Sequence, residues 1–65
     1  MFIEVITYTN TKRIININEI MTFVADPVDE GRATITFKND TFVSIEESYD
    51  HFTSRLSDLA RVHLV

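Results

Sequence analysis

RATITFKNDTFVSIE, residues 32–46, is the stretch of the chain that decides its fold. Apolar and polar residues alternate through both of its halves, and this period of two is typical of strands with one buried face. The apolar positions are Ala33, Ile35 and Phe37 in the first half and Val43 and Ile45 in the second. The polar residues between the halves are those that favour a turn.

The register of this predicted hairpin follows from its two faces. Directly opposed residues of an antiparallel pair share a face. A three-residue loop over 39–41 pairs Phe37 with Val43 and Ile35 with Ile45, whereas a two-residue loop sends the two apolar sets to opposite sides. We therefore predict the three-residue loop.

Three further strands are predicted before this hairpin, because short runs rich in β-branched and aromatic residues follow one another between polar turns. Asn10 can take the positive φ of a tight turn. A short polar corner and a longer loop with one proline and one glycine separate the other runs. The predicted strands are 2–9, 13–18 and 20–25, and the corner and loop are 18–19 and 26–31.

The period changes after the hairpin. Apolar residues recur at spacings of three, four and three, which is one stripe of a helix. Ser48 is suited to cap this helix, and Asp50 would lie in its first turn, where an anion is favoured. The helix is predicted over 48–60, across the apolar face of the hairpin. Its stripe is Tyr49, Phe52, Leu56 and Leu59.

The sequence thus predicts one domain over 1–65, of mainly β α+β class: a five-stranded antiparallel β-meander with one C-terminal amphipathic helix. The first strand is apolar on both faces. Phe2, Ile6 and Tyr8 lie on one face, and Ile3 and Val5 lie on the other. Either the sheet curls into a half-barrel or the second face meets another molecule; the residues alone leave both open.

The chain end after the helix, 61–65, is predicted either to extend the helix or to form a sixth strand. Its apolar residues and the exposed side of the first strand are the predicted partner contacts. The predicted partner-binding residues are Val62, His63, Leu64, Val65, Phe2 and Tyr8.

Composition excludes several classes of protein. Sixty-five residues with no cysteine exclude a disulfide scaffold, and a net charge of −4 is the wrong sign for an ordinary binder of nucleic acid or anionic membrane. No apolar stretch approaches the roughly 20 residues that span a bilayer. The N-terminus lacks the basic region of a signal peptide. We therefore expect a cytoplasmic protein that starts where the sequence starts.

No catalytic, metal or cofactor site is predicted. A single glycine excludes glycine-rich phosphate loops and nucleophile elbows. His51 and His63 lack a metal-binding spacing, so His51 is interpreted as an exposed residue on the polar side of the helix. The carboxylates of the long loop do not match a calcium loop and are interpreted as turn residues. These carboxylates are Asp26, Asp29 and Glu30.

The positive residues are predicted to form no basic stripe. In a simple meander the first turn and the 26–31 loop share one end of the sheet. Lys12 and Arg13 would then stand beside the loop carboxylates, with Lys38 at the opposite end, so the two signs mix.

Two segments resemble known families. NTKRIININEI (residues 10–20) and ITFKNDTFVSIEES (residues 35–48) resemble FlbD-type small flagellar and swarming-motility proteins, and the likeness extends over residues 2–59. It implies a bacterial cytoplasmic accessory factor that acts through protein contacts, and it carries over no binding residues. Residues 17–56 also resemble the first half of a LytTR-type DNA-binding domain, and 61–63 resemble the R-x-H that follows its helix. A relative of that kind would act by pairing with a DNA reader.

The predicted function is therefore a small non-enzymatic protein-interaction module, acting as a bacterial or phage regulatory or accessory subunit. Its partner is another protein or a second copy of itself, in a homodimer or a ring. The alternatives are a DNA-binding transcriptional regulator and a phage structural or assembly protein.

Overall fold

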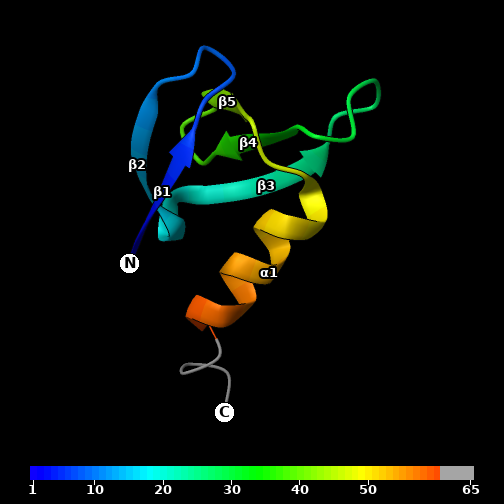
Figure 1. The fold of residues 1–65 in the computed structure, drawn as a ribbon. Coiled ribbons are helices and arrows are strands. Elements are labelled where there is room, and N and C mark those ends of the chain that lie inside the picture. Colours follow the sequence, from blue (N-terminus) through cyan, green and yellow to red (C-terminus); the bar gives the residue numbers. More distant parts are fainter. Residues whose placement is uncertain (61–65) are drawn as a thin grey trace.

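A computed structural model describes residues 1–60 (Figure 1). The class predicted from the sequence is confirmed: residues 1–60 are mainly β, with five antiparallel strands and one helix that follows them. The elements are β1 (Phe2–Ile6), β2 (Lys12–Asn16), a 3-10 helix (Ile17–Glu19), β3 (Ile20–Ala25), β4 (Ala33–Phe37), β5 (Phe42–Ile45) and α1 (Tyr49–Ala60).

The strands form two sheets rather than one continuous meander. β1 pairs with β2, and β3, β4 and β5 pair in that order. The predicted polar corner is the 3-10 helix between β2 and β3, and the Asn16 side chain caps it by accepting the Asn18 N–H at 3.0 Å. β1 instead meets β5, through a bridge between Thr7 and Ile45. The sheets are not closed, so the half-barrel alternative is not confirmed.

Two turns of the same kind connect β1 to β2 and β4 to β5. In the second, the Phe37 N–H donates to the Thr41 carbonyl at 2.8 Å, and Asp40 takes a φ of 69°. This is the three-residue hairpin loop in which a turn is followed by a left-handed residue. Asn10 takes the same role in the first turn, at a φ of 63°. Asn and Asp tolerate this conformation because their short side chains bond locally.

The turn corrects the predicted register. The loop is three residues long, as predicted, but it is 38–40 rather than 39–41. Ile35 therefore pairs with Val43, and Ala33 pairs with Ile45. The apolar residues still share one face, because a shift of two residues preserves the alternation. The left-handed residue must close the loop, and Asp40 takes that place, which moves the loop back by one residue. The first turn lies over 8–10, two residues before the gap between the predicted strands 2–9 and 13–18, so β1 ends before the predicted position 9.

The core lies between the sheets and α1. Phe52 is fully buried, and its ring lies edge-on to that of Phe23, with centroids 5.2 Å apart. The predicted stripe is confirmed for Phe52, Leu56 and Leu59, which pack in or against the core, whereas Tyr49 is 40% exposed and contacts only the edge of the core through the Phe23 ring. The predicted cap is confirmed too, because Ser48 Oγ accepts the His51 N–H at 3.1 Å. The buried apolar residues are Ile3, Val5, Ile15, Ala33, Ile35, Phe37, Val43, Ile45 and Phe52.

The 26–31 loop is held by its own carboxylates. Asp26 Oδ1 accepts the N–H groups of Val28 at 2.8 Å and Asp29 at 3.0 Å, and Asp29 Oδ1 accepts that of Gly31 at 2.9 Å. The two N–H bonds to its carboxylate lower the pKa of Asp26. Asp26 and Asp29 therefore act as turn residues, as interpreted from the sequence.

Replacing Phe52 with alanine is expected to lower the free energy of unfolding by about 3–5 kcal/mol, because it empties the centre of the core. A domain of this size has little more stability than that, so Phe52→Ala is expected to be largely unfolded. Phe52→Leu retains most of the volume and should cost about 1.5 kcal/mol or less. Urea denaturation followed by circular dichroism measures these changes. Phe42→Ala, at an exposed position of β5, is the matched control, and an equal loss in both alanine variants would contradict this account.

The Asp26 turn is expected to make stability depend on pH. Because folding lowers the pKa of Asp26, its contribution is complete above the ordinary carboxyl value of 3.8 and is lost as the pH falls through the lower folded value. Asp26→Asn keeps an oxygen acceptor without the charge. Wild type should be the more stable protein at pH 7, and the difference should vanish in acid. A difference in unfolding free energy that stayed constant from pH 7 to strongly acidic solution would contradict this role.

Candidate interaction surface

The outer face of β1 is exposed and mostly apolar, with Glu4 as its one charged residue. Phe2 is 65% exposed, Ile6 42% and Tyr8, just beyond the strand, 58%, whereas Ile3 and Val5 between them are buried. The second apolar face of this strand is therefore exposed to solvent in a single chain. Phe2 and Tyr8, both predicted partner contacts, lie on this face. The other predicted contacts, Val62, His63, Leu64 and Val65, lie outside the described residues.

Sequence analysis missed two apolar residues of this surface. Ile14 is 66% exposed and lies opposite Glu4 on the outer face of the β1–β2 pair. Phe42 is 71% exposed on β5, and it lines with Tyr8 a shallow open depression of about 490 Å³. The alternation of the hairpin did place Phe42 on the solvent side. Its proximity to Tyr8 depends on the pairing of β1 with β5, for which the sequence carries no signal.

The charged side chains near this surface are mostly paired. Arg32 donates from Nε to Glu46 Oε1 at 3.0 Å, and its Nη2 lies 2.9 Å from the same oxygen. Arg32 Nε also lies 3.6 Å from Asp29 Oδ2. The hydrogen bond and charge of Glu46 raise the pKa of Arg32. This pair joins β5 to the loop before β4 and covers part of the outer face with polar atoms.

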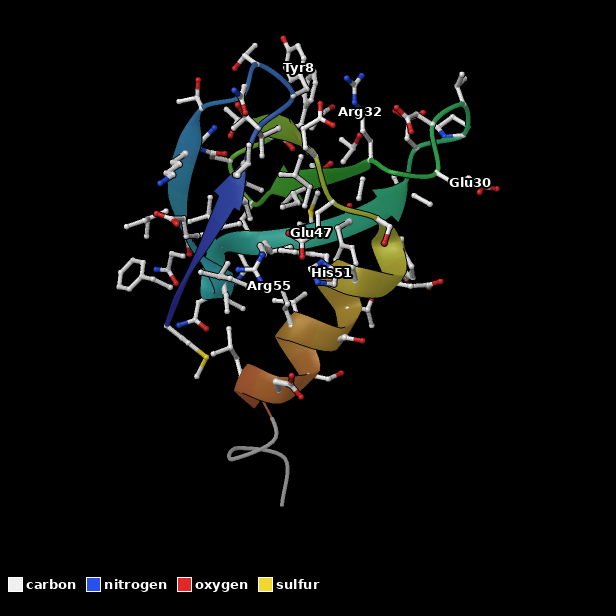
Figure 2. The ribbon with its side chains drawn as sticks, in the orientation of Figure 1. Tyr8, Glu30, Arg32, Glu47, His51 and Arg55 are labelled. Carbon is white, nitrogen blue, oxygen red and sulfur yellow. The ribbon has the colours of Figure 1, made fainter. Side chains whose placement is uncertain are left out.

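A second charged cluster lies in the groove between β1 and α1 (Figure 2). The Glu47 side chain is only 9% exposed, and its Oε1 lies 2.7 Å from Arg55 Nη1. Its Oε2 lies 2.8 Å from His51 Nδ1, a contact that is attractive only when Nδ1 carries the proton. Arg55 Nη2 donates to the Glu4 carbonyl at 2.7 Å and so links the helix to β1.

This cluster adds a contact that was not predicted for Glu47 and His51. Glu47 is a buried carboxylate with Arg55 as its cationic partner and with the His51 ring beside its second oxygen, which accepts no hydrogen bond within residues 1–60. His51 is exposed, as expected, but it is also a partner of that carboxylate. Its spacing of four from both Glu47 and Arg55 is the signal that sequence analysis passed over.

The residues that line the groove between β1 and α1 mainly connect these two elements. The groove has a volume of about 530 Å³, and it is open to solvent. The hydroxyl group that lines this groove, that of Ser48, accepts the His51 N–H as the helix cap. Within residues 1–60 no three His, Asp or Glu side chains gather as the ligands of a metal ion would. What the cluster does in this structure is hold α1 against β1.

The predicted arrangement of positive residues is wrong. Arg13 lies over the ring of Phe37, with its guanidinium carbon 5.6 Å from the ring centroid. The first turn therefore shares an end with Lys38 and not with the 26–31 loop, because β1 lies beside β5. The loop carboxylate Asp29 has Arg32 as its partner instead. Glu19 and Arg13 line the same shallow pocket near Phe37. Charges of both signs therefore also meet at the end of the sheet that carries the first turn.

Comparison with protein-family models, with curated proteins and with solved structures gives no match. The helix that the structure describes is too short and too polar to cross a membrane.

Replacing Arg55 with methionine is expected to lower the free energy of unfolding by about 1–3 kcal/mol, because a buried carboxylate loses its main partner. Adding Glu47→Gln to Arg55→Met removes the stranded charge, so the double variant should lose less than the sum of the two single losses. Urea denaturation of the four proteins measures this coupling. Additive losses would contradict the pairing.

Proposed function

We propose that this protein is a small non-enzymatic interaction module, a regulatory or accessory subunit of a bacterium or a phage. It binds a protein partner through the outer face defined by Phe2, Ile6 and Tyr8. The observation that carries this proposal is the exposure of three large apolar side chains on one face of β1 and its extension, with Glu4 as the charged residue between Phe2 and Ile6. Antiparallel sheets normally turn polar residues to solvent, and contiguous apolar patches mark interaction sites.

The position of β1 strengthens the proposal. β1 pairs with β2 along one side, and its C-terminal end also meets β5 through the bridge between Thr7 and Ile45. Its outer face therefore lies within a broad surface, with Ile14 and Phe42 on the neighbouring strands. Aromatic side chains such as Phe2 and Tyr8 are enriched where proteins bind one another.

The resemblance to FlbD-type proteins supports a role of the same kind. That family usually has glycine where this chain has Thr11 and Asp40. Asp40 adopts the positive φ that glycine would favour there, whereas in the first turn Asn10 adopts it in place of Thr11. The same turn can thus be built without the glycine. Under this proposal the protein acts in the cytoplasm, and it contributes binding rather than chemistry.

A photo-crosslinking amino acid placed at Phe2 or Tyr8 is expected to give discrete protein adducts in host cells. The matched control is the same amino acid at Val28, which is 93% exposed but lies in the 26–31 loop. Adducts are resolved by denaturing electrophoresis and identified by mass spectrometry. The absence of adducts at both β1 positions, or identical adducts from position 28, would contradict the proposal.

The tail is tested separately. If residues 62–65 take part in binding, deletion of 61–65 should weaken the crosslinks formed from Phe2 and Tyr8. Unchanged crosslinking would remove the tail from the proposed surface and leave the β1 face as the binding site.

A further inference from the structure

The outer face of the β1–β2 pair carries four side chains at the corners of a rectangle (Figure 1 shows the two strands side by side). Glu4 lies opposite Ile14, and Ile6 lies opposite Lys12. The sides measure roughly 6.8 Å along the strands and 4.8 Å between them. The two charges therefore occupy one diagonal and the two isoleucines the other.

The two charges on this rectangle have no partner within residues 1–60. Neither the Glu4 carboxylate nor the Lys12 ammonium makes a hydrogen bond or an ion pair in that part of the chain. The neighbouring ion pairs, by contrast, are closed: Arg32 contacts Glu46 at 2.9 Å and Arg55 contacts Glu47 at 2.7 Å. Beside them Ile14 and Ile6 are exposed. An apolar diagonal flanked by two unpaired opposite charges is complementary to itself.

We infer that a second copy of this chain covers the rectangle in a two-fold dimer. The two-fold axis lies in the interface, halfway between Glu4 and Lys12 and perpendicular to the line that joins them. Rotation about it places Glu4 of each copy on Lys12 of the other. The isoleucine diagonal lies close to the axis, so Ile6 and Ile14 pack near their own counterparts. This inference rests on the proposed function and names its partner.

The geometry of this dimer is that of known sheet packing. The diagonals of the rectangle cross at roughly 70°, so the strands of the two copies also cross at roughly 70°, near the orthogonal class. A standard interface needs roughly 800 Å² from each partner. That area is about one sixth of the 4677 Å² that the chain exposes. Phe2 at the start of β1 and Tyr8 just beyond its end would lie toward the rim of this interface.

The charges on this face favour a second copy of the chain as its binding partner. The chain carries a net charge of −4, so two copies repel each other over most of their surfaces. On the rectangle one acid and one base cancel, and this face is where two copies can approach without repulsion. The two-fold axis then generates two equivalent ion pairs, each between Glu4 of one copy and Lys12 of the other. A partner of uniform charge would leave either Glu4 or Lys12 facing its own sign.

The dimer is tested by sedimentation equilibrium of the full chain over a wide concentration range, with exchange of the charges. Wild type is expected to dimerise reversibly. Glu4→Lys and Lys12→Glu should each raise the Kd about tenfold, because two attractive pairs become repulsive at once. The double variant Glu4→Lys/Lys12→Glu should return to within about threefold of wild type, since the pairs are rebuilt with exchanged signs.

The controls make the same changes of net charge elsewhere. Glu30→Lys, in the exposed loop, matches Glu4→Lys, and Lys38→Glu matches Lys12→Glu. Both should leave the Kd within about threefold of wild type. Ile14→Asp should abolish the dimer but keep the native circular dichroism, since Ile14 is exposed in the monomer.

Two results would overturn the inference. One is a monomeric wild type at all concentrations. The other is a dimer that the double exchange weakens as much as the single changes do, which would place the contact elsewhere. These results are distinct from failure of the proposed function: a monomer that crosslinks to another protein from Phe2 keeps the interaction role and loses only the second copy as partner.

Discussion

Two backbone hydrogen bonds between β1 and β5 hold the two sheets of this protein together. The Tyr8 N–H donates to the Ser44 carbonyl at 2.9 Å, and the Glu46 N–H donates to the Ile6 carbonyl at 2.8 Å. Each contributes only about 1 kcal/mol to stability. Their larger effect is on how the two sheets are placed. The 3-10 helix separates β2 from β3, so the sheets are joined by hydrogen bonds between β1 and β5. With the join in place, the inner faces of both sheets converge on Phe52, and the outer faces become one surface.

The helix completes this arrangement by contacts of two kinds. Phe52 supplies the apolar contact and lies fully buried beneath the strands. Glu47 and Arg55 supply a polar contact, which reaches β1 through the Glu4 carbonyl. A buried carboxylate adds little net stability but is costly to leave unpaired, so it fixes where the helix lies. The helix therefore packs against β3, reaches β1 through Arg55, and leaves the outer face of β1 open.

The two turns decide which side chains reach that open face. Both use a left-handed Asn or Asp as the last residue of a three-residue loop. A shift of one residue would exchange the buried and exposed sets of a strand, whereas these turns keep the alternation in phase. Ile14 and Glu4 thus come to lie opposite each other on the outside. Local backbone chemistry at two positions therefore sets the composition of the proposed binding surface.

The sequence by itself determined the elements and their buried sides. Alternation located the strands, the helical spacing identified Phe52, and Ser48 signalled the start of the helix; each of these signals is carried by residues close together in the chain. Only the tertiary structure decided that β1 lies beside β5, that Arg13 lies over Phe37 and that Ile14 belongs to the surface around Phe2 and Tyr8. The physical reason is that a repeating pattern fixes which face of a strand is apolar but not which strand will pair with it. That choice depends on how all the apolar faces together close over one core.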